Sequence, residues 1–177
     1  MEKIKDVRVL TVSAFLVAIA TVLGFFKLPL TQLIEIRFQF IPIALGGAMF
    51  GPAVGGVIGA LADILGYLVK PTGAYFPGFT ISSIVVGVIY GFFFYRKKLT
   101  VSRTILAELT VTVVRSIFLN TINLSILYGQ GFWAILSARL LKTLIMFPVN
   151  TAILYASLLL LPRLLPKEIR HRFLCAD

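Results

Sequence analysis

Long apolar runs, separated by short polar, glycine-containing or proline-containing connections, make up almost the whole chain. An α-helix needs roughly 20 predominantly apolar residues to cross the hydrocarbon core of a bilayer. The pattern therefore predicts spans at residues 7–26, 40–50, 53–69, 79–95, 104–127 and 135–161, followed by a tail at residues 162–177. We predict an all-α integral membrane protein in which residues 1–177 form a single transmembrane domain of six helices.

Composition agrees with this pattern. Of the 177 residues, 59% are hydrophobic and 14% are charged, and the mean hydropathy is +0.98. Soluble domains contain only roughly 45–50% apolar residues. Because six spans use nearly the whole length, no room is left for a soluble domain of ordinary size.

The net charge of +10 is concentrated in three connecting or terminal segments. The basic residues concerned are Lys3, Lys5 and Arg8, then Arg96, Lys97, Lys98 and Arg103, and finally Arg163, Lys167, Arg170 and Arg172. With an even number of spans these segments share one side of the membrane, which the positive-inside rule makes cytoplasmic. We therefore predict a multi-pass plasma-membrane protein with both termini in the cytoplasm, and we interpret the charge as a topology signal, not as a nucleic-acid site.

A small-residue pattern runs through the second and third spans. Glycines recur every four residues, at Gly47, Gly51, Gly55 and Gly59. This spacing lets two helix backbones come close. Pro52 should divide the series between two helices, and Asp63 continues it at the end of the second. A carboxylate in an apolar span is costly and is expected to face a partner, a ligand or a water-filled cavity.

Other polar residues recur toward the outer ends of the spans. Arg115 lies near the middle of the fifth span with Asn120 and Asn123 further out, and in the sixth Arg139 and Lys142 lie near the outer end with Asn150 near the centre. Helical geometry places Arg115 and Asn123 on one face. The pattern predicts a polar cavity that opens to the outside and is lined by the third, fifth and sixth spans.

Each of these residues has a simpler interpretation. Asp63 and Arg115 could neutralise one another, Arg139 and Lys142 could extend to lipid headgroups, and the asparagines could form interhelical hydrogen bonds. Tyr75, Phe76 and Trp133 could be ordinary interfacial aromatics. The coincidence of polar faces at one depth and on one side favours a binding site.

Several function classes fit poorly. The only histidine and cysteine, His171 and Cys175, lie in the tail, and no set of metal ligands or paired carboxylates can be assembled in the outer cavity, so we expect no enzyme, metal or cofactor. No G-x-x-x-x-G-K-[ST] loop is present, so the chain is not an ATPase of that type. A purely structural subunit would not need a polar cavity.

Several motifs carry a family resemblance. These are Ala14 and Ala18 in the first span, the run GGAMFGPAVGGVIGALADILGYLV, the outer segment PTGAYFPGFT, and ARLLKTLIMFP in the last span. Over nearly its whole length the chain resembles the S components of energy-coupling factor vitamin transporters, and among them the folate-specific members. The resemblance implies a high-affinity subunit that captures folate outside the cell and works with a transmembrane coupling subunit and two cytosolic ATPases. Another vitamin or precursor, such as pantothenate or a thiamine precursor, is the alternative.

The resemblance also implies roles for residues. Folate has a flat pterin with hydrogen-bond donors, an aromatic linker and a glutamate tail with two negative charges. Asp63 and the asparagines can accept from the pterin edge, and Tyr75, Phe76 or Trp133 can stack on the rings. Ala14 and Ala18 would dock the coupling subunit. The predicted substrate-binding set is Arg37, Gln39, Asp63, Lys70, Tyr75, Phe76, Arg115, Asn120, Asn123, Arg139 and Lys142, in which Arg37, Lys70, Arg139 and Lys142 would bind the glutamate tail.

Overall fold

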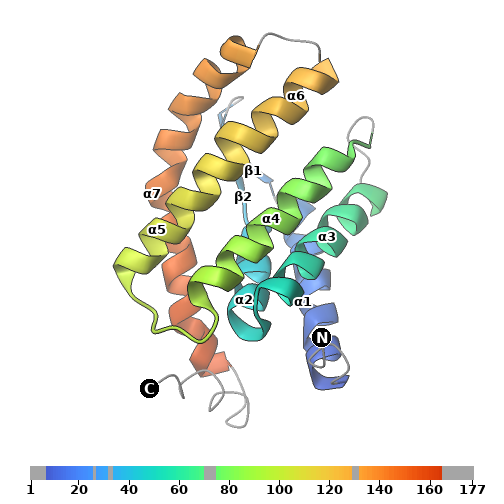
Figure 1. Ribbon diagram of the computed structural model, residues 1–177, viewed down its shortest axis with the longest axis vertical. Helices are drawn as coiled ribbons and strands as arrows, with labels where there is room; N and C mark the ends of the chain where they lie inside the picture. The colour runs from blue at the N-terminus through green and yellow to red at the C-terminus, as the bar shows by residue number, and fades with distance from the viewer. Residues whose placement is uncertain (1–6, 26, 32–33, 70–74, 129–131, 165–177) are drawn as a thin grey trace.

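The computed structural model describes residues 7–25, 27–31, 34–69, 75–128 and 132–164, and within these it describes the backbone alone at residues 8, 27–31, 34–37, 124, 127–128, 132–142 and 161–164. The elements in chain order (Figure 1) are α1 (Val7–Phe25), β1 (Lys27–Thr31), β2 (Ile34–Arg37), α2 (Phe40–Phe50), α3 (Pro52–Val69), α4 (Pro77–Phe94), α5 (Val101–Val111), η2 (Thr112–Leu119), α6 (Asn120–Tyr128) and α7 (Phe132–Leu164).

Helices lie in all six segments predicted as spans, but not all are long enough to cross a bilayer. Within the described residues, segments at Pro52–Val69, Pro77–Phe94, Val101–Asn123 and Thr143–Leu160 have the length and composition of membrane spans. Apolar helix is shorter at Val9–Phe25 and Phe40–Phe50. The 11 residues of α2 extend about 16 Å, roughly half of the hydrocarbon thickness. The fold is therefore that of a helical membrane protein in which α2 is half a span.

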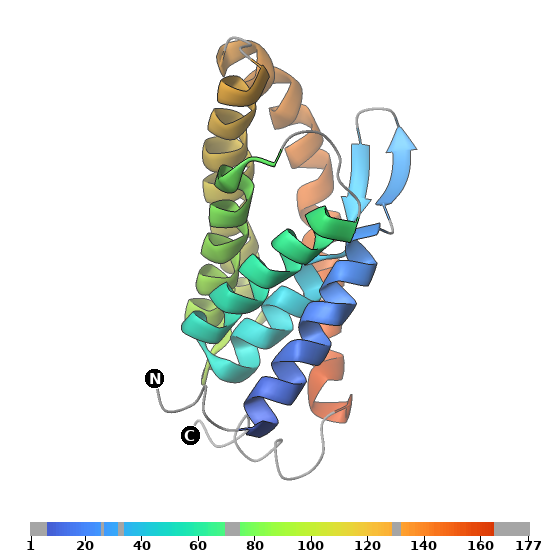
Figure 2. The ribbon, with the colours of Figure 1, turned by 90° about the vertical axis from the view of Figure 1, so that its right-hand side faces the viewer.

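The all-helical prediction needs one correction, at residues 27–37. Here β1 and β2 form an antiparallel hairpin in which Lys27 pairs with Arg37 and Leu28 with Ile36. In Figure 2 the hairpin continues beyond the end of α1 and lies beside α7. The sequence Ile34–Arg37 alternates β-branched and charged residues with a period of two, which suits a strand.

A second irregularity lies in the predicted span at residues 104–127. It consists of α5 and α6 joined by the π-helical segment η2. β-Branched residues dominate the sequence from Thr110 to Val114, and such residues are disfavoured in a regular α-helix because their side chains crowd the preceding turn. π-Helical turns often mark functional positions, and Arg115 lies within this one.

The glycine pattern forms the closest helix contact. Pro52 separates α2 from α3 as predicted, and Gly51 turns the chain between them with φ of 100°. A Cβ added at Gly55 would lie 2.6 Å from the Gly87 carbonyl oxygen and 2.8 Å from the Gly47 Cα. The backbones of α2, α3 and α4 therefore touch where side chains are absent, as small-residue spacing predicts.

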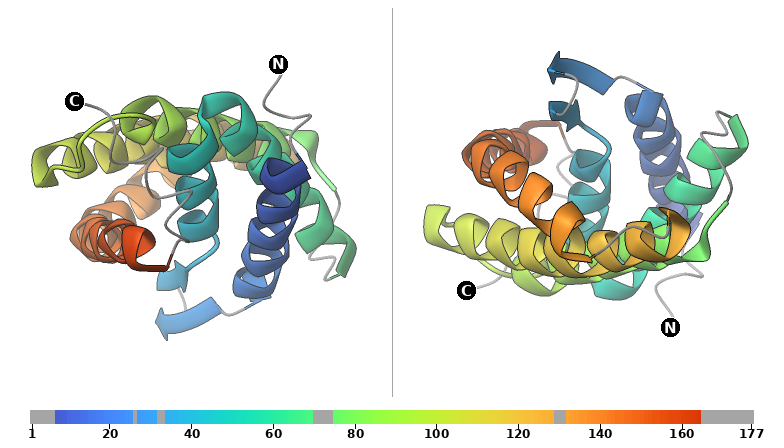
Figure 3. Two further views of the ribbon diagram at one scale, coloured as in Figure 1. Left: turned by 90° about the horizontal axis from the view of Figure 1, so that it is seen from below. Right: turned by 90° about the horizontal axis from the view of Figure 1, so that it is seen from above.

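The rest of the bundle is arranged around α2. Seen end-on, α2 lies between α1 and α7 (Figure 3), and it packs on α3 and α4 as well. Ile43, Ala44 and Ala48 of α2 are buried with Ile58 of α3 and Leu154 of α7 in the hydrophobic core. The start of α1, the end of α7 and the α4–α5 connection lie at one end of the molecule, and the end of α6 and the start of α7 lie at the other (Figures 1 and 2).

Candidate ligand-binding site

Close packing of α3 on α4 at the glycines places Asp63 next to α4. Gly59, one helical turn before Asp63, packs against the Ser83 backbone. Thr80 Oγ1 donates a hydrogen bond of 2.8 Å to Asp63 Oδ2, and Ser83 Oγ lies 3.4 Å from Asp63 Oδ1. Two hydroxyl donors from α4 thus satisfy part of this carboxylate, which is only half-buried. Because each carboxylate oxygen has two lone pairs, acceptor capacity remains.

Tyr75 joins the same cluster from the segment before α4. Its hydroxyl lies 2.9 Å from Thr80 Oγ1, and its ring packs against Tyr67 of α3 with a centroid distance of 5.1 Å. The ring is nevertheless 44% exposed. Tyr75 is therefore held at two points while one part of its surface stays open to a ligand.

Phe76 and Asn123 meet at the first turn of α4, which begins at Pro77 as is favourable for proline. Phe76 packs edge-on against Phe79 with centroids 6.0 Å apart. Asn123, from α6, is 6% exposed and donates from Nδ2 to Ser82 Oγ over 3.2 Å. Asn123 therefore forms an interhelical hydrogen bond, and its part in ligand binding stays a prediction.

A second polar cluster lies between α4, α5 and α7. Tyr90 Oη donates a hydrogen bond of 2.6 Å to Glu108 Oε2, and both residues are buried, with exposed fractions of 0% and 3%. The Asn150 side chain of α7 and the positive charge of Arg115, in η2, also act on the Glu108 carboxylate. The hydrogen bonds described for Asp63 are with two hydroxyl groups of α4, and neutralisation of Asp63 by Arg115 stays a prediction.

The remaining predicted residues are scattered along other elements. Gln39 precedes α2 and its side chain lies against Gly24 of α1. Asn120 opens α6, and its backbone N–H bonds the Arg115 carbonyl. Arg37 lies in β2, and Arg139 and Lys142 in α7, with only their backbones described; Lys70 lies outside the described residues.

The sequence analysis did not single out Thr80, Ser82, Ser83 or Tyr90, although each bonds a polar residue of another helix. The available signal was their period along α4. Thr80 and Ser83 are three residues apart and therefore share a face. Hydroxyl residues concentrated on one side of an apolar helix indicate a polar neighbour.

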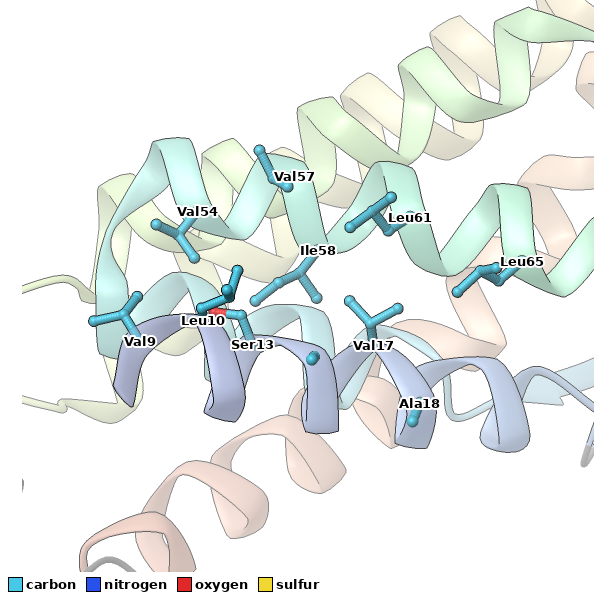
Figure 4. Close-up of a pocket in the computed structure, with 11 residues that line it drawn as sticks. Val9, Leu10, Ser13, Val17, Ala18, Val54, Val57, Ile58, Leu61 and Leu65 are labelled. Carbon is cyan, nitrogen blue, oxygen red and sulfur yellow. The ribbon is translucent and has the colours of Figure 1, made fainter. Parts of the chain in front are cut away.

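A groove lies between α1 and α3 (Figure 4). It has a volume of about 370 Å³, and its α1 wall includes Ala14 and Ala18 while its α3 wall includes Val57, Leu61 and Leu65. Both alanines are exposed. The lining is almost wholly apolar, so this groove differs in character from the polar cluster around Asp63.

These features define the class of protein. It is a helical integral membrane protein with a polar cluster suited to a ligand, and its open apolar groove offers a second contact surface. The chain belongs to the family of ECF transporter substrate-specific components, whose model matches residues 8–158. Members of this family are transporter components and not enzymes, in agreement with the sequence analysis.

Individual relatives share most of the chain. A protein named folate transporter FolT from Clostridium novyi (strain NT) is 43% identical over 160 residues, covering 90% of this chain and 93% of its own. A folate transporter FolT from Leuconostoc mesenteroides is 30% identical over 156 residues, covering 85% and 84%. The crystal structure of FolT bound with folic acid superposes with a TM-score of 0.76 at 40% identity, covering 82% of this chain and 89% of that one.

Proposed function

We propose that this protein is the substrate-binding subunit of a folate importer and that it captures folate from outside the cell. The observation that carries the proposal is the 40% identity over 82% of the chain to a structure bound with folic acid. The relative from Clostridium novyi, at 43% identity, points to the same ligand.

The contacts in the polar cluster around Asp63 support a role for Tyr75 and Phe76 in binding the rings of folate. Tyr75 is fixed by Tyr67 and Thr80 but remains partly exposed, and Phe76 is adjacent. A flat heteroaromatic ring stacked on such side chains gains apolar burial and an aromatic contact. Arg37, Lys70, Arg139 and Lys142 remain the proposed partners of the glutamate tail, and Gln39, Asp63, Arg115, Asn120 and Asn123 remain proposed members of the site.

The apolar groove supports a second part of the proposal. We assign it to a helix of the transmembrane coupling subunit, which in turn would contact two cytosolic ATPases. Ala14 and Ala18 leave the α1 wall smooth, which permits a close helix contact within a membrane. Membership of the family of ECF transporter substrate-specific components supports such a partner, and the sequence has no P-loop with which to bind nucleotide itself.

The proposed orientation places the ends of α3 and α6 outside and both termini in the cytoplasm, in a plasma-membrane protein of six passes. The basic segment at Arg96–Arg103 follows α4, at the same end as the start of α1. After Cys175 is replaced, a cysteine at Thr72 should react with an impermeant reagent from outside, and a cysteine at Thr100 should react only from inside. The reverse pattern would overturn outward capture.

Titration of the purified protein with folate tests the ligand directly. Tyr75→Ala should weaken binding because the ring loses its stacking surface, and Arg139→Ala should weaken it because a charge-assisted bond to the tail is lost, by about tenfold or more each. Phe118→Ala and Arg96→Ala are matched controls, since Phe118 is an exposed aromatic of η2 and Arg96 lies at the opposite end. A wild-type protein that binds pantothenate or a thiamine precursor but not folate would refute the assignment.

A further inference from the structure

We propose that Thr80 and Ser82 are positioning residues that hold the Tyr75–Phe76 pair, and that Asp63 and Asn123 act on the ligand through them and not by direct contact. The inference rests on the proposed folate-binding function and assigns roles within that site. It starts from two hydrogen-bonded chains that reach the first turn of α4 from opposite neighbours, α3 and α6.

The first chain fixes Tyr75. Asp63 Oδ2 accepts from Thr80 Oγ1 over 2.8 Å, and the same hydroxyl oxygen lies 2.9 Å from Tyr75 Oη. When Thr80 donates its single proton to the carboxylate, its oxygen can only accept, so the tyrosine hydroxyl must be the donor. The hydrogen bond to the carboxylate thus orients both hydroxyls. Tyr67 packs against the Tyr75 ring with centroids 5.1 Å apart, so the ring is held by a ring contact as well as by its hydroxyl.

The second chain fixes the turn that carries Phe76. Asn123 Nδ2 donates to Ser82 Oγ over 3.2 Å, and Ser82 Oγ donates to the Gly78 carbonyl over 2.8 Å. Asn123 Oδ1 and Phe76 Cε1 both lie where a side chain on Gly78 would begin. Only glycine leaves space for these two groups, so the Phe76 ring, Gly78 and Asn123 form one packed unit.

The positioning groups of the second chain are buried, whereas the Tyr75 ring is exposed. Ser82 and Asn123 are buried, with exposed fractions of 2% and 6%, whereas Tyr75 is 44% exposed. A ligand that reaches the aromatic pair therefore meets the positioned rings, while the amide and hydroxyls behind them already have partners. Preorganised rings reduce the entropy lost when a ligand is bound.

Double-mutant cycles on folate affinity test this assignment. Thr80→Val keeps the shape of the side chain but removes the shared hydroxyl, and it should weaken folate binding by about tenfold. In a Tyr75→Ala background the same change should cost less than about twofold, because nothing remains to be positioned. Thr80→Ser, which restores the hydroxyl, should recover affinity. Thr110→Val is the matched control, since that hydroxyl bonds only its own helix, at Leu106.

A parallel cycle addresses the second chain. Ser82→Ala and Asn123→Ala should each weaken folate binding when Phe76 is present, and should weaken it much less after Phe76→Ala. If Asn123→Ala prevents folding, the smaller change Ser82→Ala still tests this chain of hydrogen bonds. Equal losses in both backgrounds, or unchanged affinity in Thr80→Val, would overturn the positioning role. Failure of the wild-type protein to bind folate would instead overturn the proposed function, so the two failures are distinguishable.

Discussion

Gly55 and Gly59 of α3 are covered by the backbone of α4, whereas Ala14 and Ala18 of α1 are exposed beside an apolar groove. Both sets have the same spacing of four residues. Such spacing indicates that a backbone can approach closely, but it does not say whether that backbone belongs to the same chain. The structure separates a closed surface inside the bundle from an open one, and the open surface is the better candidate for a partner.

The largest effect is expected at the closed surface. Gly55→Leu would place a side chain where the Gly87 carbonyl oxygen lies 2.6 Å from the new Cβ, and neither backbone can move without separating α3 from α4. Overpacking alone costs about 1–3 kcal/mol, and here the contact is with backbone on two sides. We expect loss of most folded protein, measured as monodisperse material recovered in detergent.

The matched control for this change is in the same helix. Gly66→Leu adds the same side chain at a position where no heavy atom lies within 4 Å of the added Cβ. It should be recovered near the wild-type level. Equal recovery of Gly55→Leu and Gly66→Leu would show that the α3–α4 contact is not as tight as described.

The open surface should respond in function and not in folding. Replacement of both Ala14 and Ala18 by Trp fills the groove, so it should abolish ATP-dependent folate uptake in cells that supply the coupling subunit and ATPases. Folate binding by the isolated subunit should stay within about twofold, because α1 contributes no residue to the Asp63 cluster. Val22→Trp is the control, as Val22 is an exposed residue of α1 outside the groove.

Two results would contradict this assignment. Loss of folate binding in the double variant would mean that the alanine face packs within the bundle. Persisting uptake would mean that the coupling subunit contacts another surface.

Sequence reasoning located the helices well and the hairpin not at all. The α3 helix begins at Pro52 and ends at Val69, against a predicted span of 53–69, because a long apolar run between a proline and a polar loop defines its own ends. In contrast, β1 and β2 have only 5 and 4 residues, and Pro29 interrupts their alternation. So short a pattern cannot be distinguished from a loop before its pairing is known.

The site shows the same limit at the level of side chains. Asp63 could be predicted to need a partner because a carboxylate in an apolar span is costly, but its partners Thr80 and Ser83 could not be named. A helical Ser or Thr commonly bonds a carbonyl of its own helix, as Thr21 does with Val17. Whether the hydroxyl reaches across to another helix depends on the packing, here on how close Gly59 brings α3 to α4.

The smallest effect is expected at the hydrogen bond between Tyr90 of α4 and Glu108 of α5. If close backbone packing alone held α4 in place, the loss of one hydroxyl there would hardly change the free energy of unfolding. However, Tyr90 Oη donates to the buried Glu108 carboxylate over 2.6 Å. Tyr90→Phe removes that donor from the carboxylate and leaves the shape of the ring unchanged. Interhelical hydrogen bonds in membrane proteins contribute about 0.6 kcal/mol on average, and bonds to charged groups about 1.5–3 kcal/mol in proteins generally. We therefore expect Tyr90→Phe to lower the free energy of unfolding by about 1.5 kcal/mol, measured by reversible denaturation in mixed detergent, with Tyr155→Phe on α7 as the control. A change no larger than that of the control would show that the glycine contact suffices to fix α4.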